Sequence, residues 1–303
     1  MRTIRLGTFS PSVLVEVAAA TGALTAAGLK VDEIPATSSP AQFTALMDGE
    51  LDAAITNPDN VVAYRCVPDN PLARTDDIRI LAAIDQGLGL GLFAQPGLAV
   101  NQLRGKTLGV DVPGSGFAFV AYELLATLGL RRVDYTVTAL GSTPRRAQAL
   151  LSGQCGMTVL NAGNDLSAAR AGASCLARAS SLGPYVGAVL AARGRTIERD
   201  GDALAALIRV LLGTAVDLVN GDHLAVARAA AARRLDLDGA DAEQYVRTLA
   251  DPREGLVADG AMSREALGTV VDLRNRHLPR GERLNLDAVI RSGIIDDGLL
   301  PAG

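Results

Sequence analysis

The chain has 303 residues, which is enough for two domains of ordinary size. Apolar residues make up 49% of it and charged residues 20%, as is typical of compact globular proteins. The net charge is −4, aromatic residues account for only 3%, and there is no Trp. This composition argues against nucleic acid as a partner, because nucleic acid is bound by basic surfaces and aromatic stacking platforms.

The sequence predicts no membrane insertion, since no apolar run approaches the roughly 18 residues needed to span a bilayer. The residues after Met1 lack the pattern of a signal peptide. We therefore expect a cytoplasmic protein if Met1 is the native start, and an extracytoplasmic one if a signal peptide has been removed. Cys66, Cys155 and Cys175 are too few for a disulfide framework. Free thiols are expected, and a pair between Cys155 and Cys175 stays open as the alternative.

Strands and helices alternate through the first part of the chain. Gly49 suits the left-handed end of a helix, and Asn57 followed by Pro58 suits the start of another. Such a succession predicts a parallel sheet with helices on both faces. The predicted strands are 4–9, 31–36, 51–55, 78–84 and 88–94, and the predicted helices are 10–27, 39–49 and 57–65.

The stretch 45–60 occurs a second time, 104 positions later. In that register Gly49 matches Gly153 and Asn57 matches Asn161. Extending the register backwards places the strand at 3–7 over 107–111. A run that carries strand, helix, strand and loop in the same order predicts two similar lobes.

The second lobe repeats this pattern, and a helical tail follows it. Strand 186–192 is predicted to pair with strand 88–94 as a two-stranded crossing between the lobes. The fold class is thus α/β, with 1–93 and 184–303 forming lobe one, 94–183 forming lobe two, and the tail packing on lobe one. The remaining predicted elements are strands 106–112, 133–140 and 157–160, and helices 117–128, 144–151, 203–220, 225–234, 240–249, 264–275 and 286–292.

Three motifs carry a resemblance to a known family. They are Gly49-Glu50-Leu51-Asp52-Ala53, Asp85-Gln86 at a strand end, and Leu103-Arg104-Gly105-Lys106-Thr107-Leu108-Gly109-Val110. The chain resembles, over nearly its whole length, the nitrate/sulfonate/taurine and thiamine-precursor group of type II periplasmic-binding-protein folds. These are the substrate-binding components of ABC importers. The resemblance implies two lobes that close on a small ligand and an importer's permease as partner; importer members carry export signals, and none is visible here.

In a fold of this kind the ligand lies between the lobes, and loops at the C-terminal ends of strands contact it. Hydroxyls, amides and helix-start N–H groups suit a buried polar ligand, because unpaired polar atoms are costly there. Several of these side chains also suit helix capping, so both roles stay open. The candidate ligand-binding residues are Ser10, Ser12, Thr56, Asn57, Asp59, Asp85, Gln86, Ser115, Gly116, Ser142, Asn161, Asn164 and Tyr185.

Asp59 and Asp85 are the chemically reactive candidates. A carboxylate in a cleft can bind a ligand ammonium, or act as a general acid or base if its pKa is raised. The alternatives are a helix-start acid at Asp59 and an ordinary turn residue at Asp85. Arg145 and Arg146 fall in the first turn of a helix, where the dipole disfavours a cation. A carboxylate or sulfonate partner is one interpretation of this pair, and a solvated helix face is the preferred one.

The leading hypothesis is a monomer that binds a small polar organic molecule, without cofactor or metal, as the substrate-binding protein of an ABC importer. The alternative is a cytoplasmic enzyme on the same scaffold. It would be of the lyase type, a decarboxylase or dehydratase acting on a small carboxylate, with Asp59 and Asp85 as its catalytic candidates.

Overall fold

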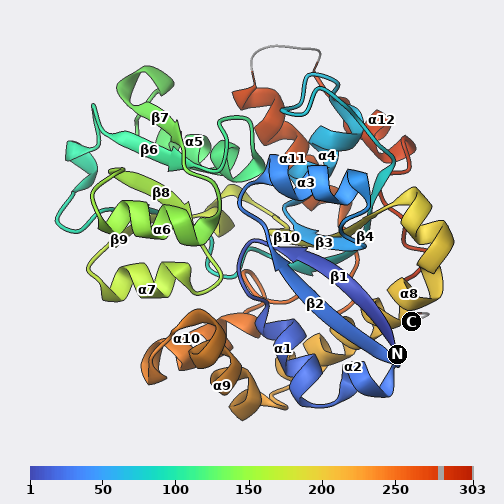
Figure 1. Cartoon of the computed structure of the whole chain (residues 1–303). Helices are drawn as coiled ribbons and strands as arrows, with labels where there is room; N and C mark the ends of the chain where they lie inside the picture. Colours follow the sequence, from blue (N-terminus) through green and yellow to red (C-terminus); the bar gives the residue numbers. More distant parts are fainter. Residues whose placement is uncertain (279–282, 302–303) are drawn as a thin grey trace.

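A computed structural model of the chain describes residues 1–278 and 283–301. Two five-stranded sheets form the framework, each flanked by helices (Figure 1). The first has the order β2-β1-β3-β10-β4 and the second the order β7-β6-β8-β5-β9. The strands are β1 (Arg2–Thr8), β2 (Leu29–Pro35), β3 (Ala53–Thr56), β4 (Ile78–Asp85), β5 (Gly91–Ala94), β6 (Thr107–Val110), β7 (Thr136–Ala139), β8 (Met157–Leu160), β9 (Ser174–Arg178) and β10 (Ala188–Arg193).

Helices connect the parallel strands and form the C-terminal part of the chain. The longest, α8, contains one residue with non-helical backbone angles, Asp200, so it consists of two helical segments joined at a kink. The helices are α1 (Val13–Ala20), α2 (Ala23–Ala26), α3 (Ser39–Asp48), α4 (Pro58–Cys66), α5 (Gly116–Thr127), α6 (Thr143–Leu151), α7 (Asn164–Arg170), α8 (Gly194–Val219), α9 (Leu224–Leu235), α10 (Gly239–Leu249), α11 (Arg264–His277) and α12 (Leu286–Arg291).

The internal repeat is visible in the strand pairing. In each sheet the first strand, β1 or β6, lies between two parallel neighbours. The next strand, β10 or β5, lies antiparallel to one of these neighbours, and the outer strand, β4 or β9, lies antiparallel to that strand in turn. Gly49 and Gly153 both end a helix turn with positive φ, 78° and 76°. Only glycine adopts this conformation without steric cost, which explains its presence at both equivalent positions. The prediction of two similar α/β lobes is confirmed.

The two segments that cross between the sheets do not pair with each other as predicted. β5 lies antiparallel between β8 and β9, and β10 lies antiparallel between β3 and β4. Each crossing segment thus adds the fourth strand to the sheet it enters, which satisfies its backbone hydrogen bonds there. The crossings do run side by side, since Gly187 N–H donates to the Asp85 carbonyl at 2.8 Å. The predicted lobe boundary at residue 93 falls inside β5, whose four residues all pair in the second sheet.

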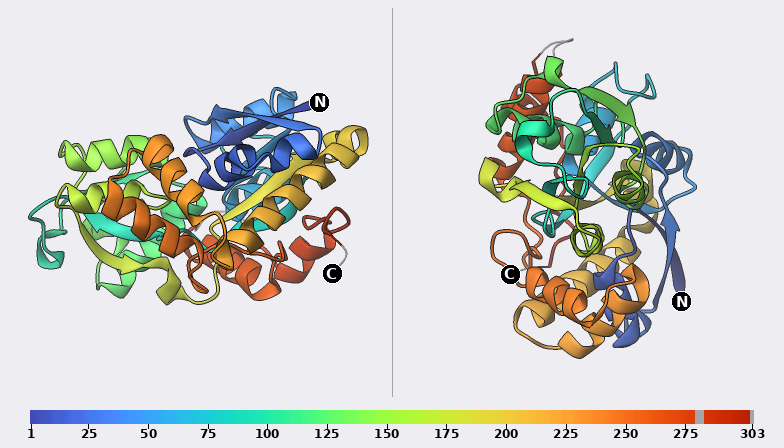
Figure 2. Two further views of the ribbon diagram at one scale, coloured as in Figure 1. Left: turned by 90° about the horizontal axis from the view of Figure 1, so that it is seen from below. Right: turned by 90° about the vertical axis from the view of Figure 1, so that its left-hand side faces the viewer.

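The helical tail contacts both parts of the molecule rather than the first lobe alone. α9 packs on α1, and α10 contacts both α9 and α7, so this pair bridges the two parts (Figure 2). α11 lies against α4 and α5. A continuous cluster of buried apolar side chains runs from Phe43 and Val61 through Leu108 and Phe119 to Leu267. The two sheets therefore share a core on the α4–α5–α11 side.

Two further elements were not predicted from the sequence. α7 and β9 follow the second copy of the repeat, and β9 forms the outer strand of the second sheet. Strand 133–140 is shorter than predicted, because a single 3₁₀ turn at Arg132–Asp134 precedes β7. Of the helices that the structure describes, none is long and apolar enough to cross a membrane.

Candidate functional site

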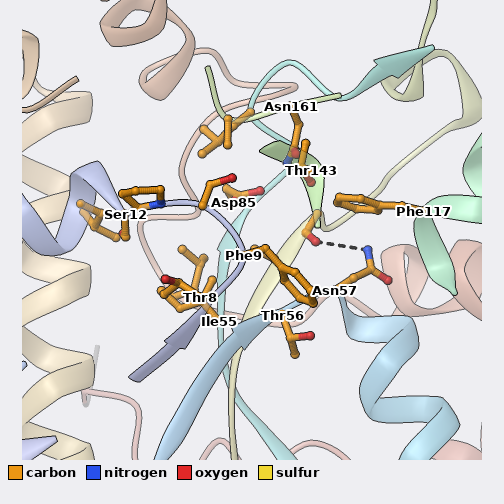
Figure 3. A pocket seen from close by; sticks show the side chains of 18 of the residues that line it. Thr8, Phe9, Ser12, Ile55, Thr56, Asn57, Asp85, Phe117, Thr143 and Asn161 are labelled. Atoms are coloured by element: carbon orange, nitrogen blue, oxygen red, sulfur yellow. Dashed lines mark hydrogen bonds between the residues drawn. The ribbon is translucent and has the colours of Figure 1, made fainter. Parts of the chain in front are cut away.

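A cavity lies between the two sheets, at the C-terminal ends of β1, β3 and β4 and of β6 and β8. Its volume is about 110 Å³, room for a small organic molecule. Figure 3 shows Asp85, Asn57 and Thr143 converging on it from different elements, with Phe9 and Phe117 as aromatic walls. Both sheets and the starts of α1, α4, α5 and α6 thus contribute to one cavity.

Eight of the thirteen predicted site residues line this cavity, and the other five do not. The lining residues are Ser10, Ser12, Thr56, Asn57, Asp85, Ser115, Gly116 and Asn161. The residues outside the lining are Asp59, Gln86, Ser142, Asn164 and Tyr185.

Three of the five support the lining residues instead. Tyr185 accepts a hydrogen bond from Asn57 Nδ2 at 2.8 Å, and Asn164 Nδ2 donates to Ser10 Oγ at 3.1 Å. The Ser142 backbone N–H donates to the Thr37 carbonyl at 3.0 Å, which joins the start of α6 to the loop before α3. Each of these contacts fixes the position of a loop that borders the cavity. Their assignment as ligand contacts stays a prediction.

Gln86 turns away from the cavity toward the tail. Its Nε2 donates to the Pro252 carbonyl at 2.9 Å, and its backbone N–H donates to the Gly255 carbonyl. The residue therefore anchors the segment between α10 and α11 to the end of β4.

Asp59 is fully buried and paired inside the protein. Its Oδ1 accepts from Arg274 Nε at 2.7 Å and its Oδ2 from Arg274 Nη2 at 2.8 Å. Desolvation raises the pKa of the Asp59 carboxyl, and the Arg274 guanidinium opposes that rise. Arg274 belongs to α11, so the pair attaches the tail to the first turn of α4. Both carboxylate oxygens have a partner, which leaves little capacity for a ligand.

Asp85 is also buried but has no cationic partner among the described residues. Its Oδ1 accepts one hydrogen bond, from Gly87 N–H at 2.8 Å. Burial raises the pKa of Asp85 to about 7, because the charged form loses hydration without gaining a counter-charge. At neutral pH this carboxyl can therefore gain or lose a proton, or accept a cation.

Arg146 lines the cavity as well, and the preferred expectation of a solvated face is wrong for it. Its side chain is only 2% exposed. Nη1 donates to the Gly141 carbonyl at 2.7 Å, and Nη2 donates to Thr143 Oγ1 and the Val159 carbonyl. Burial lowers the pKa of Arg146 to about 10, and the nearby Asp111 carboxylate opposes that shift.

The repeat could have identified Arg146 from the sequence. Gln42, 104 positions earlier, is equally buried and donates to the Ile55 carbonyl, the counterpart of Val159. Both helices thus present a long polar side chain to the strand that follows them. Asp111 was also missed; it follows β6, lines the cavity and accepts the Ser39 N–H at the start of α3.

Three hydroxyl groups on the cavity wall accept a hydrogen bond but donate none to the described residues. Ser10, Thr56 and Thr143 each accept a bond, from Asn164, Asn60 and Arg146 respectively. Within residues 1–278 and 283–301 none of the three shows a partner for its own O–H. The same part of the chain contains no group of three or more side chains able to hold a metal ion.

No protein-family model matches the sequence, and no curated protein matches it. Solved structures do match, over nearly the full chain. A ligand-binding component of an ABC-type import system from Staphylococcus aureus has 13% identity and a TM-score of 0.77, covering 99% of this chain and 98% of its own. The alkanesulfonate-binding protein SsuA from Xanthomonas axonopodis has 18% identity and a TM-score of 0.74, covering 95% and 97%.

Two further matches show how widely the scaffold is used. The periplasmic nitrate-binding protein NrtA from Synechocystis has 11% identity and a TM-score of 0.78, covering 98% of this chain and 86% of its own. The desulfurization enzyme DszB has 15% identity and a TM-score of 0.64, covering 96% and 99%. At this level of identity the matches establish architecture and leave the ligand open. The chain has the periplasmic-binding-protein fold.

Proposed function

We propose that the chain binds a small polar organic molecule in the cavity between its sheets, as the substrate-binding component of an ABC-type importer. The observation that carries the proposal is the cavity itself. It lies between both sheets and is lined by hydroxyls with free donors and by Asp85, which has no counter-ion among the described residues. Buried polar groups of this kind are stabilised only when a ligand or water satisfies them.

The fold supports this proposal, because several proteins with the same architecture are binding components of import systems. In that role the protein acts outside the cytoplasm and delivers its ligand to a permease. The first lobe and the second, divided near residues 93 and 184, then close on the ligand. The location outside the cytoplasm, the permease partner and the closure of the lobes are all parts of the proposal.

A screen by thermal shift tests it. A ligand at 100 times its dissociation constant stabilises the folded state by about 2.7 kcal/mol and raises the melting temperature by several degrees. Small carboxylates, sulfonates, amino acids and heterocycles form the first panel. Thr56→Val removes a hydroxyl from the cavity, and Thr214→Val removes an equally buried hydroxyl from α8 as a matched control. Loss of binding in both variants, or no binding by any compound to the parent, contradicts the proposal.

An enzyme on the same scaffold is the second candidate, and Asp85 is the observation that favours it. A buried carboxyl with a pKa of about 7 at the wall of a cavity suits proton transfer to or from a substrate. The lyase reaction on a small carboxylate then uses Asp85 as its catalytic residue. Asp59 is no longer a catalytic candidate, because Arg274 donates to both its oxygens. Mass spectrometry of each bound compound after incubation with the protein distinguishes the two candidates, since a binding protein returns it unchanged.

A further inference from the structure

Asp85 differs from the other buried aspartates of the described chain. Asp52 pairs with Arg5, Asp59 with Arg274, and Asp165 lies 3.6 Å from Arg178. Asp111 accepts the Ser39 N–H with both oxygens. Asp85 receives one backbone N–H on a single oxygen and forms no ion pair.

The charges that line the cavity do not balance. Among the lining residues only Asp85, Asp111 and Arg146 are charged. Arg146 thus supplies one positive charge against two carboxylates. When Asp85 is ionised, the side chains that line the cavity therefore carry one negative charge in excess. A ligand with one positive charge neutralises it, whereas an anionic ligand adds to it.

Apolar side chains surround this end of the cavity. The lining residues nearest to Asp85 in the chain, Ile84 and Leu88, are joined by Tyr245 and Leu249 of α10 and by Leu256. Asp85 itself forms an isolated bridge with Leu256. Burial raises the pKa of the Tyr245 hydroxyl, and the Asp85 carboxylate raises it further. An apolar ligand body thus fits beside the carboxylate.

We infer that Asp85 selects ligands that carry a protonated amine or an amidinium group on an apolar body. The inference rests on the proposed function and names the class of ligand for that same cavity. The hydroxyls of Ser10, Thr56 and Thr143 then donate to acceptor oxygens elsewhere on the ligand. Since burial raises the pKa of Asp85 to about 7, binding of a cation near pH 6.5 also releases a proton from this carboxyl.

Matched pairs of compounds test the inference by isothermal titration calorimetry. Benzamidine and benzamide have nearly the same shape, as do benzylamine and benzyl alcohol, but only the first of each pair is a cation. We expect the parent protein to bind the cation at least 10-fold more tightly. Repeating the titration at pH 6.5 in buffers of different ionisation enthalpy should show proton release with the cation alone.

Asp85→Asn keeps an oxygen for the Gly87 N–H and removes the charge. It should abolish the preference for the cation, whereas Thr56→Val, which removes a hydroxyl and no charge, should leave the cation the tighter-binding member of each pair. Equal affinity of the parent for both members of each pair, including no binding of either, overturns the inference. If anionic or neutral compounds bind the parent while the cations do not, the inference fails and the proposed function stands. If no compound of any charge binds, both fail.

Discussion

Asp59 and Asp85 lie at the C-terminal ends of two strands of the first sheet and have different surroundings. One follows β3, the other ends β4, and both strands run in the same direction on either side of β10. Arg274 holds both oxygens of Asp59, whereas Asp85 receives one backbone N–H. The paired carboxylate stabilises the assembly of the tail with the sheets. The unpaired one costs stability and is therefore the better candidate for function.

The largest effect is expected from breaking the pair. Asp59→Asn leaves the Arg274 guanidinium buried without its counter-ion, which should lower the free energy of unfolding by about 3–5 kcal/mol. Urea denaturation measures it. The double variant Asp59→Asn with Arg274→Met removes both charges and should recover most of the loss. A single variant as stable as the parent means that the pair does not form.

The second prediction concerns Asp85 and pH. The pKa of Asp85 is raised to about 7 in the folded protein, from about 3.9 in an unfolded chain. The unfolded chain therefore loses this proton first, and the stability contributed by protonated Asp85 is lost as the pH rises from about 4 to 7. At about 1.36 kcal/mol per unit, the loss is as much as about 4 kcal/mol.

Asp85→Asn removes this dependence. Compared with the parent, the variant should have similar stability near pH 4 and higher stability at pH 8, as measured by urea denaturation at each pH. The comparison with the parent isolates Asp85 from the other acidic groups. A variant that is less stable than the parent at pH 8 indicates a charge-stabilising contact for Asp85 that the structure does not contain.

The sequence could predict the scaffold because the signals that define it are local. The internal repeat, the Gly49 and Gly153 helix ends and the Asn57-Pro58 helix start each depend on neighbouring residues. The roles of Asp59 and Asp85 could not be predicted in the same way. Arg274 lies 215 positions from Asp59, so only the folded chain shows which aspartate is paired.

The predicted pairing of the crossing strands was wrong for the same reason, because the partners lie far apart in the sequence. Strands 88–94 and 186–192 both looked free to pair, and their partners are set by the folded sheets rather than by adjacent residues. β9 was missed because its residues are half exposed and lack an apolar run. Arg146 was assigned to a solvated face from its charge and its place in the first turn of a helix, and its equivalence to Gln42 in the repeat was not used.

A smaller effect is expected at the contact between the two parts of the molecule. A Cβ on Gly116 would lie 2.1 Å from Asn57 Oδ1 and 2.6 Å from Asp59 Cβ. Gly116→Ala should therefore lower the free energy of unfolding by about 1–3 kcal/mol, because the added methyl group overpacks the contact with Asn57 and Asp59. Gly114→Ala is the matched control, since its added Cβ meets nothing within 4 Å. Equal stability of the two variants in urea denaturation contradicts the close approach.

The difference between the two aspartates can be measured directly by NMR titration of the side-chain carboxyl carbons. In the free protein the Asp85 signal should titrate with a pKa of about 7. With benzamidine bound, that pKa should fall by at least one unit, because a nearby cation favours the charged carboxylate. The Asp59 signal should not respond to the ligand. An Asp85 carboxyl that titrates near 3.9 in the free protein, or that is unchanged by a bound cation, contradicts the account.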